Sequence, residues 1–165
     1  LDAYELLLSR RQDIPDLVMV GTKPDEAQWG PRLEHSPLAG RVRCPGYVDR
    51  ATLKSLYTNA LLLVMPSLDE GFGLPILEAM TIGVPVVSSN RGALPEVLGE
   101  AGLLVDPIDP SNIAEAITQI LTDETLAMQC ITRGLDQAQL FTWKASAQAL
   151  CAAYQKAIAV REARR

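Results

Sequence analysis

The residues best suited to chemistry lie in a glycine-rich stretch that begins at Glu70 and ends at Glu78. Gly71 and Gly73 carry no side chains, so a ligand can approach the backbone closely there. Pro75 suits the first turn of a helix, and no Ser, Thr, Asp or Asn stands directly before it as a side-chain cap. The first N–H groups of that helix therefore lack an internal partner, and they favour an anion such as a phosphate.

Two carboxylates flank this predicted anion site, with seven residues between them. A carboxylate is electrostatically favoured near a helix N-terminus, where Glu78 is expected. An ionised carboxylate only accepts hydrogen bonds, which suits the hydroxyl groups of a sugar or a ribose. Glu70 and Glu78 can equally be a solvated loop residue and a residue that offsets the helix dipole, and the spacing alone leaves both interpretations open. The stretch also lacks the dinucleotide-binding GxGxxG pattern.

Short apolar segments alternate with amphipathic ones around this stretch, which is typical of an α/β domain with a parallel sheet. The clearest buried strand is predicted at 61–65, and ligands gather at the carboxyl ends of such strands. Further strands are expected at 16–21, 41–44, 85–88 and 103–105. Helices are expected at 1–11, 50–59, 75–81, 94–98, 111–122, 124–140 and 144–161. Apolar residues recur at helical spacing along the last helix and are expected to be core: Trp143, Ala147, Leu150, Tyr154 and Ile158.

The composition excludes several functions. The 165 residues are 48% apolar and 21% charged, as in one globular domain, and no apolar run approaches the length of a membrane span. A net charge of −5 without a basic stripe argues against nucleic-acid binding. The three cysteines, Cys44, Cys130 and Cys151, are far apart and are expected to be buried and reduced. The single histidine, His35, is expected at the surface and cannot support a multi-histidine metal site.

The stretch at 70–80, Glu-Gly-Phe-Gly-Leu-Pro-Ile-Leu-Glu-Ala-Met, resembles the donor-site signature of the family 4 (group 1) retaining glycosyltransferases. The match continues at 20–21, 46–48, 56–57, 83–88, 94–97, 102–107 and 141–143, so it covers nearly the whole chain. The resemblance implies the C-terminal half of a GT-B fold, a Rossmann-like parallel sheet flanked by helices. This half would bind a nucleotide-diphosphate sugar.

The resemblance also implies a role for each matching residue. The implied catalytic residues are Glu70, Phe72 and Gly73, and the implied donor-binding residues are Gly71, Leu74, Glu78, Tyr47 and Val48. Glu78 would bind the ribose hydroxyls, Glu70 would face the transferred sugar, and the residues around Tyr47 would meet the base. The reaction would be a hexosyl transfer with retention at the anomeric carbon. It would need no metal or other cofactor, because preorganised N–H donors stabilise the charge of the leaving diphosphate.

Two parts of the family pattern are absent from the chain. The family has a first strand and a basic loop that holds the pyrophosphate, whereas this sequence starts inside the following helix. The first strand is central in a 3-2-1-4-5-6 sheet, so its loss leaves unpaired edges. We therefore expect that another segment fills the gap, that the sheet is distorted, or that it pairs with another molecule. The acceptor-binding N-terminal domain is also absent, and the chain alone is expected to be inactive.

Residues 1–140 are expected to form the nucleotide-sugar-binding domain, and the helix in 141–165 is expected to contact the N-terminal domain. The acceptor would be a glycan or a lipid-linked glycan, as in polysaccharide biosynthesis. The enzyme would lie in the cytoplasm, at the inner face of a membrane. Two alternatives remain open at this point: a GT-B-fold nucleotide-sugar epimerase that uses the same cleft, and a non-catalytic subunit that binds sugar nucleotides.

Overall fold

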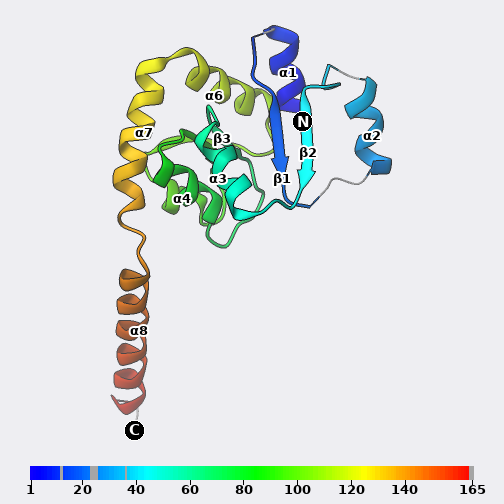
Figure 1. The fold of residues 1–165 in the computed structure, drawn as a ribbon. Helices are drawn as coiled ribbons and strands as arrows, with labels where there is room; N and C mark the ends of the chain where they lie inside the picture. The colour runs from blue at the N-terminus through cyan, green and yellow to red at the C-terminus, as the bar shows by residue number, and fades with distance from the viewer. Residues whose placement is uncertain (12, 23–25, 36, 164–165) are drawn as a thin grey trace.

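A computed structural model describes residues 1–11, 13–22, 26–35 and 37–163, with the backbone only at 26, 28 and 35. Helices and strands alternate along most of this chain (Figure 1). The strands are β1 (Leu17–Val20), β2 (Val42–Gly46), β3 (Leu63–Met65), β4 (Val86–Ser89) and β5 (Gly102–Val105). The helices are α1 (Asp2–Arg10), α2 (Glu26–His35), α3 (Arg50–Thr58), α4 (Leu74–Ile82), α5 (Leu94–Leu98), α6 (Pro110–Thr122), α7 (Glu124–Ala138) and α8 (Trp143–Ala163).

The described strands form two parallel sheets instead of one. β1 pairs with β2 in the first sheet, and β4 lies between β3 and β5 in the second. In the strand order that the resemblance implies, the absent first strand would lie between β1 and β3. The interruption therefore falls at the expected place, and the described strands do not form one fully paired sheet.

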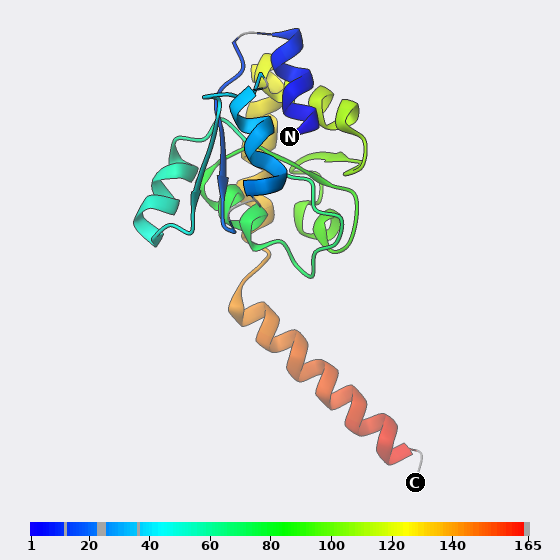
Figure 2. The same ribbon diagram turned by 90° about the vertical axis from the view of Figure 1, so that its right-hand side faces the viewer.

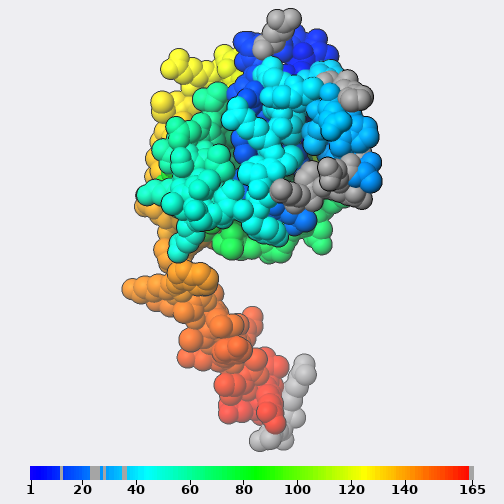
Figure 3. All heavy atoms as spheres, turned by 45° about the vertical axis from the view of Figure 1, so that its right-hand side comes forward, coloured from blue at the N-terminus to red at the C-terminus, as the bar shows by residue number. Residues whose placement is uncertain are grey.

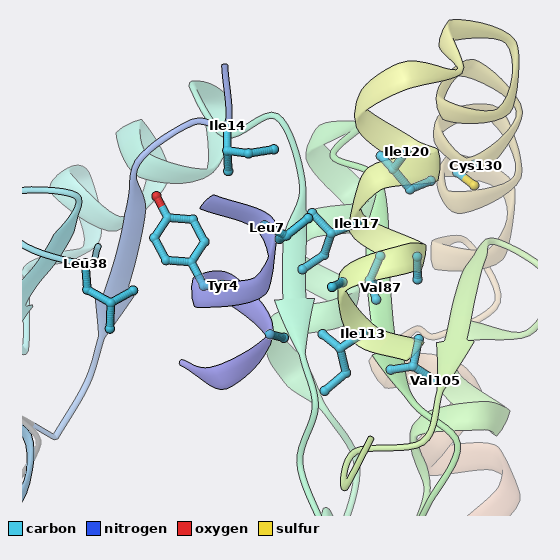
Figure 4. Packing of buried hydrophobic residues seen from close by; sticks show 13 residues of the cluster. Tyr4, Leu7, Ile14, Leu38, Val87, Val105, Ile113, Ile117, Ile120 and Cys130 are labelled. Carbon is cyan, nitrogen blue, oxygen red and sulfur yellow. The ribbon is translucent and has the colours of Figure 1, made fainter. Parts of the chain in front are cut away.

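One apolar core connects the two sheets. Tyr4 and Leu7 of α1 are buried in the same cluster as Val87 of β4 and Ile117 of α6. Figure 4 shows Leu7 pointing toward Ile117. Partly buried residues from both sheets pack against this cluster, among them Leu17, Val42 and Val64. Burial of these side chains holds the sheets together despite the missing backbone pairing.

A second apolar cluster lies beneath the glycine-rich loop. α4 contributes Ile76, Ala79 and Met80, whose spacing of three and four places them on one face of the helix. This face packs with Leu94 and Leu98 of α5. The first turn of α4 is thereby held against the second sheet.

The prediction that 61–65 is the most buried strand is wrong. All three residues of β3 are only half-buried, whereas every residue of β4 is buried. The reason is position: β3 is an edge of its sheet beside the interruption, and β4 is flanked on both sides.

The prediction that the last helix contributes to the core is also wrong for this chain. No residue of α8 is buried, and Trp143 is 90% exposed. Figures 1 and 2 show α8 projecting away from the body, and Figure 3 shows the space-filling surface narrowing before it. Among the described residues, no helix is both long enough and apolar enough to cross a membrane.

Candidate functional site

The glycine-rich loop joins the end of β3 to the first turn of α4. Gly73 is the N-cap of α4 and has a left-handed backbone, with φ of 96°. The left-handed backbone favours glycine, and a Cβ atom at this position would stand 2.6 Å from the Cδ2 atom of Leu94, whose side chain would have to shift. No side chain caps this end of the helix, as the sequence predicts.

The backbone before α4 presents unpaired N–H groups. The N–H groups of Ile76 and Leu77 point back to the carbonyl oxygen of Gly73, at 3.0 and 3.5 Å. Within the described chain, the N–H groups of Phe72, Gly73 and Leu74 have no acceptor. Unpaired donors at the positive end of a helix dipole favour a phosphate group.

Glu70 lies in this loop, and a neighbouring loop holds its backbone. The N–H of Ala93, just before α5, donates to the carbonyl oxygen of Glu70 at 3.1 Å. The carboxylate of Glu70 has no hydrogen-bond or ion-pair partner in the described part of the chain, and the residue is half-exposed. Its acceptor atoms are therefore available to a ligand.

Glu78 lies on the exposed side of α4 and has one side-chain donor. The Tyr57 hydroxyl, on α3, lies 3.1 Å from the Oε2 atom of Glu78. Burial and the charge of Glu78 raise the pKa of the Tyr57 hydroxyl far above its usual value. Tyr57 therefore remains a hydrogen-bond donor throughout the physiological pH range.

The implied catalytic Phe72 has its ring engaged in packing. The rings of Phe72 and Phe141 meet edge to face, with centroids 5.8 Å apart. Phe141 lies between α7 and α8, so this contact ties the loop to the start of the last helix. The part of Phe72 that remains available to a polar ligand is its backbone N–H.

The two residues implied for base binding follow β2. Tyr47 is 84% exposed, and its hydroxyl lies 3.1 Å from the Oγ1 atom of Thr22, which follows β1. Val48 is half-buried. The loops after β1 and β2 thus meet at the end of the first sheet, but among the described residues no hydrogen bond joins them to the glycine-rich loop.

The remaining chemistry-bearing residues have separate surroundings. Arg91, after β4, forms an exposed ion pair with Asp106 at 3.1 Å. Lys23 and the side chain of His35 lie outside the described residues. The prediction that all three cysteines are buried is wrong, because Cys151 is exposed on α8. In the described chain, no group of three or more His, Cys, Asp or Glu residues is arranged to hold a metal ion.

Most of the glycine-rich loop is exposed, although Gly73 itself is buried. Leu74 is 57% exposed and Phe72 is 39% exposed. Two shallow hollows of the described surface lie away from this loop, one along α7 and one between α1 and α6. The exposed residues of the loop are therefore accessible to a ligand.

Comparison with known proteins identifies the family. Residues 1–137 match the family described as "Glycosyl transferases group 1". The chain belongs to this group 1 glycosyltransferase family. Over 147 residues it is 44% identical to the O-antigen chain mannosyltransferase B of Escherichia coli. That alignment covers 87% of the chain but only 38% of the mannosyltransferase.

Solved glycosyltransferase structures share the fold. The sucrose-phosphate synthase of Thermosynechococcus elongatus superposes with a TM-score of 0.78 and 31% identity, covering 96% of the chain and 42% of that protein. The C-terminal domain of a group 1 glycosyl transferase from Francisella tularensis gives a TM-score of 0.72 and 26% identity, covering 84% of the chain and 74% of that domain. The predicted family and the predicted α/β fold, a GT-B domain with parallel strands flanked by helices, are confirmed.

Sequence reasoning missed two residues that shape this site. Tyr57 lies in the family match without a predicted partner for its hydroxyl, and no role was predicted for Gly92. A tyrosine at the end of an amphipathic helix, followed closely by a strand, carries no local sign of its hydroxyl partner. Only the packing of α3 against α4 brings Tyr57 to Glu78.

Proposed function

We propose that the chain is the donor-binding domain of a retaining glycosyltransferase, which transfers a hexose from a nucleotide-diphosphate sugar to a glycan or lipid-linked acceptor. The observation that carries the proposal is the uncapped start of α4, where three unpaired N–H groups lie between Glu70 and Glu78. The diphosphate would lie against these N–H groups. Charge that develops on the leaving diphosphate would then be stabilised by donors already in place, without a metal ion.

The side chains around the loop fit the other parts of such a donor. Glu78 offers a carboxylate to ribose hydroxyls, and Glu70 offers an unpaired carboxylate to the transferred sugar. Gly71 leaves the approach open, because nothing lies within 4 Å of a Cβ atom placed on it. The exposed ring of Tyr47, next to Val48, offers a surface on which a base can stack.

We propose that transfer needs a second domain. The chain spans 38% of the length of the curated mannosyltransferase that it matches. Its glycine-rich loop is mostly exposed, and α8 exposes Trp143, Leu150, Tyr154 and Ile158. Residues 1–140 would then bind the donor, and the helix in 141–165 would pack on the domain that binds the acceptor. The chain by itself would bind the donor without transferring the sugar.

The relatives support a mannosyl donor and a surface polysaccharide as product. The E. coli protein at 44% identity is named an O-antigen chain mannosyltransferase. Other E. coli relatives, at 34% identity, are named serotype-specific mannosyltransferases. We propose that the protein extends a mannose-containing glycan.

Calorimetric titration of the chain with nucleoside diphosphates tests the proposal. Glu78→Gln should weaken both the diphosphates and their sugars by about 1–3 kcal/mol, as for a lost hydrogen bond to a charged group. Glu70→Gln should leave diphosphate binding unchanged, because its proposed partner is the sugar. Glu115→Gln, at an exposed position of α6, is the control. Equal losses for Glu70→Gln and Glu78→Gln with both ligands would contradict the assigned roles.

Acceptor dependence separates transfer from the epimerase alternative. A transferase that includes this domain releases free nucleoside diphosphate only when an acceptor is present. Isomerisation of the sugar nucleotide without an acceptor would contradict the proposal. The long match to a glycosyltransferase family favours transfer.

A further inference from the structure

Tyr57 reaches from α3 to the first two turns of α4. Its hydroxyl lies 3.1 Å from the Oε2 atom of Glu78 and 3.5 Å from the carbonyl oxygen of Pro75. The hydroxyl has one hydrogen to donate, and the carboxylate is both nearer and charged. The hydrogen is therefore donated to Glu78.

The ring of Tyr57 is held in place while the side chain of Glu78 is exposed. Tyr57 is half-buried and packs against the apolar cluster beneath the glycine-rich loop. Asp49 caps α3, since its carboxylate accepts a hydrogen bond from the Thr52 N–H at 2.7 Å. A fixed donor thus meets a carboxylate whose side chain would otherwise rotate in solvent.

We infer that Tyr57 is a positioning residue for Glu78. It holds the carboxylate through Oε2 and leaves Oε1 free to accept from the ribose hydroxyls of the donor. This inference rests on the proposed function. Without the Tyr57 hydroxyl, the Glu78 side chain must be ordered when the ligand binds, and this ordering costs affinity.

Tyr57→Phe removes only the hydroxyl and therefore measures the effect of the hydrogen bond to Glu78. Affinity for a nucleoside diphosphate should fall about 3- to 10-fold, as for one hydrogen bond. The matched control is Tyr4→Phe, which removes a hydroxyl on α1 that donates to the carbonyl oxygen of Pro15 at 2.7 Å. Tyr4→Phe should leave nucleotide affinity unchanged.

The experiment is a calorimetric titration of the chain with UDP, GDP and ADP, continued with whichever binds most tightly and with its 2′,3′-dideoxy form. In the unmodified chain the ribonucleotide should bind more tightly than the dideoxy form. Tyr57→Phe should weaken the ribonucleotide and leave the dideoxy form unchanged. In a Glu78→Ala background, Tyr57→Phe should have no further effect, because no carboxylate remains to be positioned.

The outcomes separate this inference from the proposed function. If Glu78→Ala weakens the ribonucleotide but Tyr57→Phe does not, the positioning role is overturned and the proposed function stands. One contrary result is that Tyr57→Phe weakens both nucleotides equally, and another is that it still reduces affinity in the Glu78→Ala background. Either result shows a structural role for Tyr57 and also overturns the inference. If Glu78→Ala changes no affinity, the proposed role of Glu78 fails and the inference fails with it. Thermal unfolding of each variant confirms that it is folded.

Discussion

Gly92 lies directly against the backbone of Glu70. A Cβ atom placed on Gly92 would stand 2.8 Å from the carbonyl oxygen of Glu70 and 3.0 Å from its nitrogen. The next residue, Ala93, donates its N–H to the same carbonyl oxygen. The loop after β4 therefore fixes the backbone of the loop that carries the proposed sugar-facing carboxylate, although the two loops are distant in the sequence.

Gly92→Ala should destabilise the chain and displace Glu70. Gly92 has a positive φ of 60°, which an alanine adopts only with strain, and the new methyl group would contact backbone that cannot rotate away. We expect a loss of about 1–3 kcal/mol in the free energy of unfolding, measured in urea. Binding of a nucleotide sugar should weaken as well.

Gly40→Ala is the matched control for that variant. Gly40 also has a positive φ, of 70°, but nothing lies within 4 Å of the position of its Cβ atom. Gly40→Ala should lose stability through backbone strain alone and should leave ligand binding unchanged. The contact between Gly92 and Glu70 would have no functional role if both variants lost the same stability and neither changed nucleotide-sugar affinity.

Removal of the Asp109 cap should loosen the packing of α6 on α1. The Asp109 carboxylate accepts hydrogen bonds from the N–H groups of Ser111 and Asn112. Asp109→Ala should cost about 0.5–2 kcal/mol of stability in a urea titration. Glu115→Ala, at an exposed position inside the same helix, should stay within about 0.5 kcal/mol of the unmodified chain. An equal effect of the two variants would argue against the cap.

The pairing of β1 with β2 should weaken in acid. Asp16, just before β1, forms ion pairs with Arg41 at 2.9 Å and with Arg43 of β2 at 3.0 Å. The hydrogen bond from Arg41 is the main cause that lowers the pKa of the Asp16 carboxyl below its usual value. Because the folded-state pKa is the lower one, this stabilisation is present above the unfolded-state pKa of 3.8 and is lost as the pH falls through the folded-state pKa.

Urea unfolding at pH 7 and pH 3 measures this effect. Asp16→Asn should reduce the free energy of unfolding at pH 7. Between pH 7 and pH 3, this variant should lose less stability than the unmodified chain loses. Asp69→Asn, at an exposed residue without an ion pair in the described chain, should keep the full acid dependence. If Asp16→Asn lost as much stability in acid as the unmodified chain, other carboxylates would be responsible for the acid dependence.

The cysteines should differ in their reactivity toward iodoacetamide at pH 8, followed by mass spectrometry. Cys151 is exposed on α8, whereas Cys130 is buried, and burial raises the pKa of the Cys130 thiol. The thiolate is the reactive form, so Cys130 should react slowly until urea unfolds the chain. Cys151→Ser should remove the fast reaction. Equally fast modification of Cys130 in the folded chain would show that α7 opens readily.

The sequence by itself determined the family, the α/β class and the local structure of the glycine-rich loop. Gly73 and Pro75 specify an uncapped helix start, because one allows a left-handed backbone and the other suits a first helical turn. The division of the sheet could also be expected, since it follows from the order in which parallel strands pair. These features depend on residues that are neighbours in the sequence, or on rules of connection.

Only the tertiary structure decided which distant residues meet and which apolar residues are buried. Tyr57 contacts Glu78 because α3 packs on α4, and Gly92 contacts Glu70 because the loops after the neighbouring strands β3 and β4 meet. β3 and α8 both carry apolar residues, yet β3 lies at the edge of its sheet and no residue of α8 is buried. Apolar character measures the tendency of a residue to leave water, and the arrangement of the other elements decides whether it does.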